Sequence, residues 1–297
     1  MYKEIDYNKK ITWVVVLGFV FLLVLVIYFF GEISNLGYFG IVLGLMISMP
    51  SALIGYFAGD SVVLYLAGAK QISKKDDPRL FGVVENIAIT AGLPVPKVFV
   101  IQDNSMNAFA TGRDPHHASI AITSGLLNIL EKSELEGVIA HEFSHIKNFD
   151  IRLSMVLVVF VGLIVALSDI IWRIGLGGSG SRKKGGSLIF IIGLIFIIVS
   201  PFVARFLQMF LSRKREYLAD AEAALLTRYP EGLASALEKL SAQEKMLSNV
   251  NNALNHLYIV SPIDNVEGRK KSSWFSGLFM THPPIKDRIV KLRSMSV

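Results

Sequence analysis

Residues 137–150 read GVIAHEFSHIKNFD, and an apolar run of the kind that enters a membrane begins at residue 153. His141 and His145 are four positions apart, so on an α-helix their imidazoles share a face and can reach one ion. Glu142 lies beside the first histidine, where it can take a proton from a metal-activated water without being a ligand. The stretch therefore predicts a metal site on a helix at the foot of a membrane segment.

The surrounding residues favour a helix for this motif. Ser133 and Glu136 have the spacing of a capping box, which would open a helix through SELEGVIAHEFSHIKN. The alternative is a pair of solvated or helix-capping histidines. The predicted helix and its apolar face make that explanation the weaker one.

Composition indicates a membrane protein and restricts the metal chemistry. Hydrophobic residues make up 52% of the 297 residues, and the mean hydropathy is +0.50. The chain has no cysteine, so a zinc ion would be held by histidine and carboxylate. The net charge is +6, but Lys and Arg gather beside the apolar runs, which favours contact with a lipid bilayer over nucleic acid.

The N-terminal part, residues 1–69, is expected to form a transmembrane hairpin with spans at about 11–30 and 35–59. The first span is too long for a removed signal peptide and lacks a small-residue cleavage site. A stripe of small residues in the second span predicts close packing on a neighbouring helix. Its members are Gly40, Gly44, Ser48, Ser51, Gly55 and Gly59. Lys and Arg flank both ends of the hairpin, which places both ends in the cytoplasm.

A second apolar hairpin is expected at residues 153–204, and its geometry stays open. Residues 153–168 are only slightly short of a span, whereas 185–204 are long enough. If both cross, the connector with Arg182, Lys183 and Lys184 lies outside, against the charge rule, so a re-entrant hairpin is the alternative. Either geometry leaves residues 70–152 and 205–297 on the cytoplasmic side, as the two parts of one peptidase domain.

The globular segments predict a mostly helical α+β fold with a small sheet beside the histidine helix. Residues 76–93 read as a helix that stops at Gly92, residues 97–103 and 118–123 as strands, and 107–117 as a loop. We expect 118–123 to be the edge strand, able to pair with an extended substrate. The candidate substrate contacts are Ala118, Ser119, Ile120 and Ala121, with Asn107 and Ala108 in the preceding loop as contacts or turn residues.

The third ligand is expected in RKREYLADAEAALL, residues 213–226. Glu216 and Asp220 are four positions apart, so Glu216 can bind the ion while Asp220 accepts the free ring N–H of a ligating histidine. The alternative is that both are surface acids paired with Lys214 or Arg215. His116, His117 and His256 lack ligand spacing to the motif, and we interpret them as exposed or structural.

Five motifs together resemble a known family. They are NAFATGRDP at 107–115, IAITSGLL at 120–127, HEFSHIKNFD at 141–150, REYLADAEAA at 215–224 and THPPIKDRI at 281–289. In this order they resemble the HtpX family of membrane-bound zinc endopeptidases, which is related to the CAAX prenyl endopeptidases. The match spans nearly the whole chain, and its departures, such as the phenylalanines in HEFSHIKNFD, are conservative.

The resemblance implies an integral membrane gluzincin with one zinc ion on His141, His145 and Glu216, and Glu142 as general base. It also makes His282 a candidate stabiliser of the transition state, although a packed core or loop residue is equally consistent. Arg288 is expected either to brace Asp150 or another acid near the site, or to lie on a solvated helix face.

The resemblance further implies a multi-pass enzyme of the prokaryotic cell (inner) membrane that degrades damaged or misfolded membrane proteins. Two rival functions stay open: a CAAX-type prenyl-protein endopeptidase, and a catalytically idle metal-binding scaffold. The short chain with two early spans argues against the first. Glu142 argues against the second, because a structural zinc site needs no base there. The sequence leaves the oligomeric state open.

Overall fold

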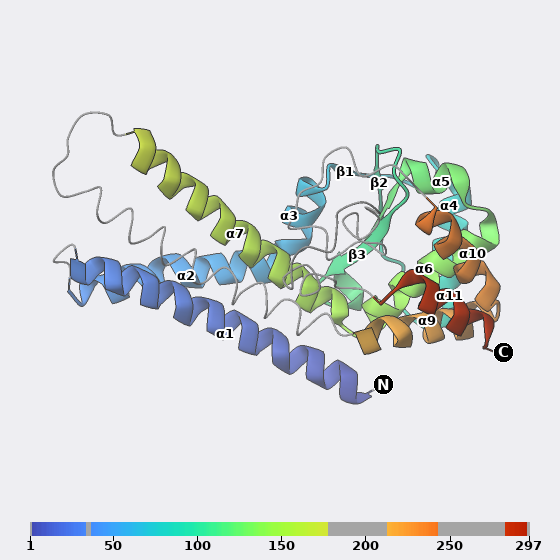
Figure 1. Cartoon of the computed structure of the whole chain (residues 1–297), viewed down its shortest axis with the longest axis horizontal. Coiled ribbons are helices and arrows are strands. Elements are labelled where there is room, and N and C mark those ends of the chain that lie inside the picture. The colour runs from blue at the N-terminus through green and yellow to red at the C-terminus, as the bar shows by residue number, and fades with distance from the viewer. Residues whose placement is uncertain (1, 34–36, 178–212, 243–282, 296–297) are drawn as a thin grey trace.

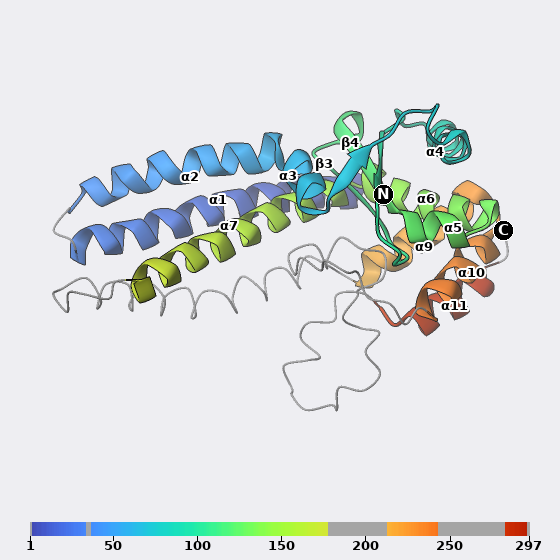
Figure 2. The same ribbon diagram turned by 90° about the horizontal axis from the view of Figure 1, so that it is seen from above.

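The computed structural model describes residues 2–33, 37–177, 213–242 and 283–295, and of residues 164–177 only the helical backbone. Three long helices extend from a globular end that carries the sheet and the shorter helices (Figure 1). They are α1 (Tyr2–Ile33), α2 (Phe39–Phe57) and α7 (Asp150–Gly177). α1 and α2 lie side by side along most of their length, whereas α7 contacts both near the globular end and diverges from them further out (Figures 1 and 2).

Two helices in the described part of the chain are long and apolar enough to cross a membrane. These segments are Lys3–Phe29 and Phe39–Phe57, where the two early spans are expected. The second hairpin is described only as far as Gly177, within α7. Its connector and its second run lie outside the described residues.

The small-residue stripe of α2 packs against two different helices. A Cβ added to Gly44 would lie 2.9 Å from the Cα of Val24 on α1, and one added to Gly55 would lie 2.8 Å from the ring of Phe160 on α7. The ring of Phe160 also stacks on Phe19 of α1, with centroids 3.8 Å apart. Small side chains let helix backbones approach closely, so the stripe holds the three helices together. The predicted packing role is confirmed.

The sheet formed by the described residues has four strands in the order β1-β2-β4-β3. They are β1 (Ala69–Gln71), β2 (Lys97–Ile101), β3 (Ala108–Gly112) and β4 (Ala118–Thr123). β2 and β4 are parallel, and the other two pairs are antiparallel. The mostly helical α+β prediction, with a small mixed sheet, is confirmed.

The predicted position of the edge strand is wrong. β4 is paired on both sides, by β2 and by β3, so its backbone groups are used within the sheet. The edge strands of this sheet are β1 and β3, and β3 lies in a segment predicted to be a loop. Gly112 (φ 141), Asp114 and Pro115 are turn signals, and they do mark a tight connection, the 3₁₀ turn η1 (Pro115–His117). That connection joins two paired strands, so Ala108 is a strand residue instead of a loop residue.

The described residues form seven further helices in the globular part. They are α3 (Gly59–Leu66), α4 (Pro78–Ala91), α5 (Ser124–Ile129), α6 (Lys132–Lys147), α9 (Arg213–Thr227), α10 (Pro230–Ser241) and α11 (Ile285–Arg293). Of these, α3, α5 and α6 contact the sheet. Helix α4 ends at Gly92, which adopts the left-handed conformation (φ 67), as predicted.

Helix α6, which carries HEFSH, runs through the centre of the globular part and packs on α4, α9, α10 and β3. Its Ile139 and Phe143 are fully buried, and burying each side chain contributes about 1.5–3 kcal/mol. The capping box lies two residues earlier than predicted: the backbone N–H of Glu131 donates to Glu134 Oε2 at 2.8 Å, so Ser133 and Glu136 do not form it. Because the helix begins at Lys132, its N-cap is Glu131 and the residue at position N3 is Glu134.

Candidate metal centre

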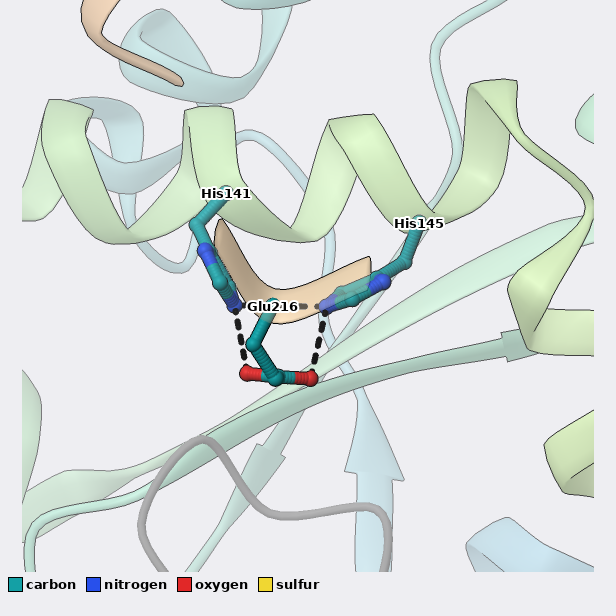
Figure 3. A group of neighbouring side chains, drawn as sticks. All are labelled: His141, His145 and Glu216. Carbon is teal, nitrogen blue, oxygen red and sulfur yellow. Dashed lines mark hydrogen bonds and ion pairs between the residues drawn. The ribbon is translucent and has the colours of Figure 1, made fainter. Parts of the chain in front are cut away.

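Three side chains from two helices converge on one point (Figure 3). The Nε2 atoms of His141 and His145 on α6 are 3.2 Å apart. Glu216 on α9 places its Oε2 3.7 Å from Nε2 of His141 and its Oε1 3.7 Å from Nε2 of His145. One candidate ligand atom from each residue lies within 4.8 Å of the others. The two histidines, predicted to share a helix face, and the carboxylate, predicted to come from a helix distant in sequence, therefore lie together.

The other ring nitrogen of each histidine contacts a carboxylate. His141 Nδ1 lies 3.1 Å from Asp220 Oδ1, and His145 Nδ1 lies 3.0 Å from Asp150 Oδ2. A carboxylate at Nδ1 holds the proton there, which leaves the Nε2 lone pair directed at the shared point. The contact between Asp220 and His141 agrees with the sequence-based expectation for Asp220.

Asp150 was expected only as a possible partner of Arg288, and its contact with His145 was not predicted. It lies just beyond the end of α6, and helical spacing does not bring it to His145. The backbone of Phe149 adopts a positive φ of 61°, and this turn between α6 and α7 returns Asp150 to the imidazole. The one signal in the sequence was an acid five residues after His145. A separation of five does not place two residues on one face of a helix, so the contact could not be inferred from periodicity.

Arg288 on α11 is fully buried and contacts the carboxylates of α9. Its Nη2 and Nε lie 2.6 and 2.9 Å from the two oxygens of Asp220, and its Nη1 lies 3.5 Å from Glu216 Oε2. The solvated helix face considered for Arg288 is therefore wrong. The acid that it braces is Asp220, whereas Asp150 pairs with Arg215 at 3.1 Å.

Glu216 and Asp220 are buried, which contradicts the alternative that they are ordinary surface acids. Burial raises the pKa of Asp220, but the positive charge of Arg288 and the hydrogen bond to His141 outweigh it, and the pKa lies below its usual value. Asp220 is therefore ionised at neutral pH.

The two histidines experience different fields. Burial lowers the pKa of His141, which favours the neutral imidazole that a metal requires. Burial also acts to lower the pKa of His145, but Asp150 and Glu216 outweigh it and raise the pKa to about 9. The negative charges of these carboxylates stabilise a positive charge at this point, and they would stabilise a divalent cation more strongly than a proton.

Glu142 is buried beside this cluster. Burial is the main cause that raises its pKa to about 7, and His145 and a backbone hydrogen bond from Ala110 of β3 act in the opposite direction. The carboxyl group thus lies between the cluster of His141, His145 and Glu216 and the edge strand β3. A group with a pKa near 7 can both accept and release a proton at neutral pH.

The remaining candidates have different outcomes. Ala118, Ser119, Ile120 and Ala121 are buried in β4 and paired on both sides. Asn107 is buried at the start of β3, where its Oδ1 accepts from the N–H of Ala108 at 3.0 Å. His116 and His117 are exposed, as predicted. His256 and His282 lie outside the described residues.

The donor set fits a zinc ion. Two neutral imidazole nitrogens and one carboxylate are a ligand set of catalytic zinc sites, which leave a further position for water or substrate. All three side chains are buried or largely buried, and both imidazoles are oriented through Nδ1. His141, His145 and Glu216 are therefore a group that could hold a metal ion.

The fold and this site define a membrane metallopeptidase. Residues 74–296 match Peptidase family M48, and the chain belongs to this family. The resemblance to HtpX proteases is confirmed by relatives named Protease HtpX homolog. That of Dictyoglomus thermophilum is 44% identical over 294 residues, which cover 99% of this chain and 94% of the relative. Those of Tropheryma whipplei and Listeria monocytogenes are 41% identical and cover 99% of this chain and 98% and 100% of the relatives.

Among solved structures, the crystal structure of S. mikatae Ste24p is similar, with a TM-score of 0.50 over 90% of this chain. The two sequences are 22% identical, so the likeness is one of fold. The chain spans 62% of the length of that structure.

Proposed function

We propose that the protein is a zinc-dependent endopeptidase of the prokaryotic cell membrane that degrades damaged or misfolded membrane proteins. The observation that carries the proposal is the convergence of His141, His145 and Glu216, with Glu142 buried beside them. The helices that carry this cluster, α6 and α9, lie in the globular part from which α1, α2 and α7 extend (Figure 2), which supports substrates that are presented at a membrane surface.

His141, His145 and Glu216 would hold one zinc ion per chain. Zinc supplies a Lewis acid that polarises a carbonyl and acidifies water. Asp220 and Asp150 keep the Nδ1 protons in place, so that each histidine offers Nε2. Arg288 holds Asp220 and lies beside Glu216, so it stabilises two acids whose mutual repulsion would otherwise loosen the site.

Glu142 would act as the general base. It takes a proton from the attacking water as the water oxygen bonds to the scissile carbonyl carbon. It then delivers the proton to the amide nitrogen as the C–N bond breaks, which releases a free amine and a carboxylic acid. His282 stays a proposed donor to the oxyanion.

An extended substrate would pair with β3 in place of β4. In the sheet formed by the described residues, β3 is one of the two edge strands, and Ala110 on it contacts Glu142. Backbone pairing reads conformation more than side chains, so we expect broad specificity for unfolded segments. Asn107 and Ala108 are candidate contacts at the start of this strand.

The peptidase domain and both termini are proposed to be cytoplasmic. The positive residues on both sides of the first hairpin support this orientation. The start of α1 also contacts the globular part, since Asn8 donates to the backbone oxygen of Asn148 at 2.8 Å.

The test is casein cleavage by the purified full-length protein in detergent, loaded with zinc. Glu142→Gln should lower turnover by about 10²–10⁴-fold, because it removes the general base. Its zinc content should stay at the wild-type level. Glu136→Gln, on the same helix but outside the site, is the matched control and should keep wild-type activity.

Each rival function has its own outcome. Equal turnover by wild type and Glu142→Gln would contradict the metallopeptidase mechanism. Bound zinc without turnover in either protein would favour the scaffold. Cleavage of a prenylated CAAX peptide without cleavage of casein would favour the prenyl-protein endopeptidase.

A further inference from the structure

A side chain of the first membrane helix lies within the hydrogen-bond network of the metal site. Asn8, on α1, is fully buried, and its Nδ2 lies 2.7 Å from Asp150 Oδ1. The same nitrogen donates to the backbone oxygen of Asn148, at the end of α6, at 2.8 Å. Both contacts fall on the turn that joins α6 to α7, 140 and 142 residues away in sequence.

Asp150 is held at both of its oxygens. Oδ2 contacts the ring of His145 at 3.0 Å, and Oδ1 accepts from Asn8 at 2.7 Å and from Arg215 at 3.1 Å. A carboxylate fixed at one oxygen can still rotate, whereas donors on the second oxygen fix its plane. The orientation of His145 therefore depends on the donors to Oδ1 as well as on Asp150 itself.

The first helix contacts this turn a second time. The ammonium group of Lys9 lies 4.3 Å from the centroid of the Phe149 ring, and the guanidinium of Arg152 lies 4.8 Å from the same centroid. Phe149 is the residue whose positive φ returns Asp150 to His145. Asn8 on α1 thus holds Asn148 and Asp150, and the neighbouring Lys9 contacts Phe149 between them.

Stability alone gives little reason for an asparagine at this position. Burying an amide is costly unless its groups are paired. Within the described part of the chain, Oδ1 of Asn8 has no hydrogen-bond partner, and leaving a buried acceptor without a donor destabilises the folded state. An apolar residue of similar size would avoid this cost but could not hold the carboxylate.

We infer that Asn8 is a positioning residue of the metal site, which makes the first membrane helix part of the catalytic apparatus. The inference rests on the proposed zinc site, because it acts through Asp150 on His145. Zinc affinity then depends on the packing of α1 against the turn at residues 148–150, and not only on the ligands.

The test is zinc affinity, measured by chelator competition on the full-length protein in detergent. Asn8→Leu removes the donor at similar volume and should weaken zinc binding by roughly 3–10-fold, below the ~10–100-fold expected for Asp150→Asn. Thr12→Val is the matched control. Thr12 is equally buried, one turn further along α1, and its hydroxyl donates to the backbone oxygen of Asn8. Its zinc affinity should be that of wild type.

A double variant separates positioning from general destabilisation. If Asn8 acts through Asp150, adding Asn8→Leu to Asp150→Asn should weaken binding by less than about twofold, since coupled residues are not additive. Saturating zinc should restore most of kcat in Asn8→Leu without a change in KM. A merely structural role would lower the thermal stability of the zinc-free protein and leave zinc affinity unchanged.

Wild-type zinc affinity in Asn8→Leu, or full additivity in the double variant, would overturn the inference. If Asn8→Leu does not fold, Asn8→Ser, whose shorter hydroxyl cannot reach Asp150 in the same way, is judged by the same criteria. A wild-type protein that binds no zinc would instead contradict the proposed function.

Discussion

The guanidinium of Arg288 forms two hydrogen bonds with the carboxylate of Asp220, Nη2 to Oδ1 at 2.6 Å and Nε to Oδ2 at 2.9 Å. Asp220 in turn contacts His141. Three helices are joined in this way, because α11 holds the acid of α9 that orients the histidine of α6. A planar guanidinium matches a carboxylate with two parallel bonds, whereas an ammonium group does not.

Arg288→Lys should therefore weaken zinc binding by roughly 10–100-fold, since it keeps the charge but loses the paired geometry. Chelator competition measures this affinity. Arg293→Lys is the matched control on the same helix, because Arg293 pairs with Glu231 and Glu238 at the surface. Unchanged zinc affinity in Arg288→Lys would show that Asp220 does not need a bidentate partner.

The lowered pKa of Glu134, in the first turn of α6, predicts that the stability of the protein depends on pH. Burial raises the pKa of Glu134, but Lys239 at 2.7 Å, Ser235 at 2.6 Å and the N–H of Glu131 outweigh it, and the pKa lies below the usual value of 4.5. A carboxyl group with a depressed pKa stabilises the folded state above its unfolded pKa. That contribution is lost as the pH falls through the folded pKa.

Glu134→Gln should lower the free energy of unfolding by about 1–2 kcal/mol at pH 7. The difference from wild type should shrink as the pH falls below 4.5. Thermal unfolding in detergent at several pH values measures it. Glu136→Gln is the control, because its ion pair with Lys132 (3.8 Å) lies in solvent and contributes about 0–1 kcal/mol. A difference that stays constant with pH would contradict the prediction.

Close packing of the membrane helices predicts different effects for two glycines. A Cβ at Gly44 would lie 2.9 Å from the Cα of Val24, whereas a Cβ at Gly18 would meet no atom within 4 Å. Gly44→Ala should destabilise the protein by about 1–3 kcal/mol, because α1 and α2 must move apart. Gly18→Ala, the control, should be neutral or slightly stabilising. Equal melting temperatures for the two variants would contradict the packing.

The proposed orientation can be read from single cysteines, because the chain has none of its own. Tyr38 lies at the turn between α1 and α2 and is highly exposed, and Lys132 is exposed at the start of α6. We expect an impermeant maleimide to label Tyr38→Cys in intact cells and Lys132→Cys only after permeabilisation. The reverse pattern would place the peptidase domain outside.

Local features of the sequence predicted the parts of the site that follow helical periodicity. Residues four apart on a helix share a face, and this alone pairs His141 with His145 and Glu216 with Asp220. The apolar runs placed the first two membrane helices, and Gly92 placed the end of α4. The edge strand β3 was predicted to be a loop because its short run AFATG stands beside turn signals and resembles a loop until its partner strand is known.

The sequence by itself determined that two histidines share one face of a helix, that an acid lies beside the first of them and that the first two long helices are apolar enough to cross a membrane. Only the tertiary structure decided which side chains hold these residues in place: Arg288 on Asp220, and Asp150 and Asn8 on His145. Arg288 and Asp220 are 68 residues apart, and Asn8 and Asp150 are 142 apart. Helical periodicity relates only residues of one element, whereas contacts between elements depend on how the helices pack against one another.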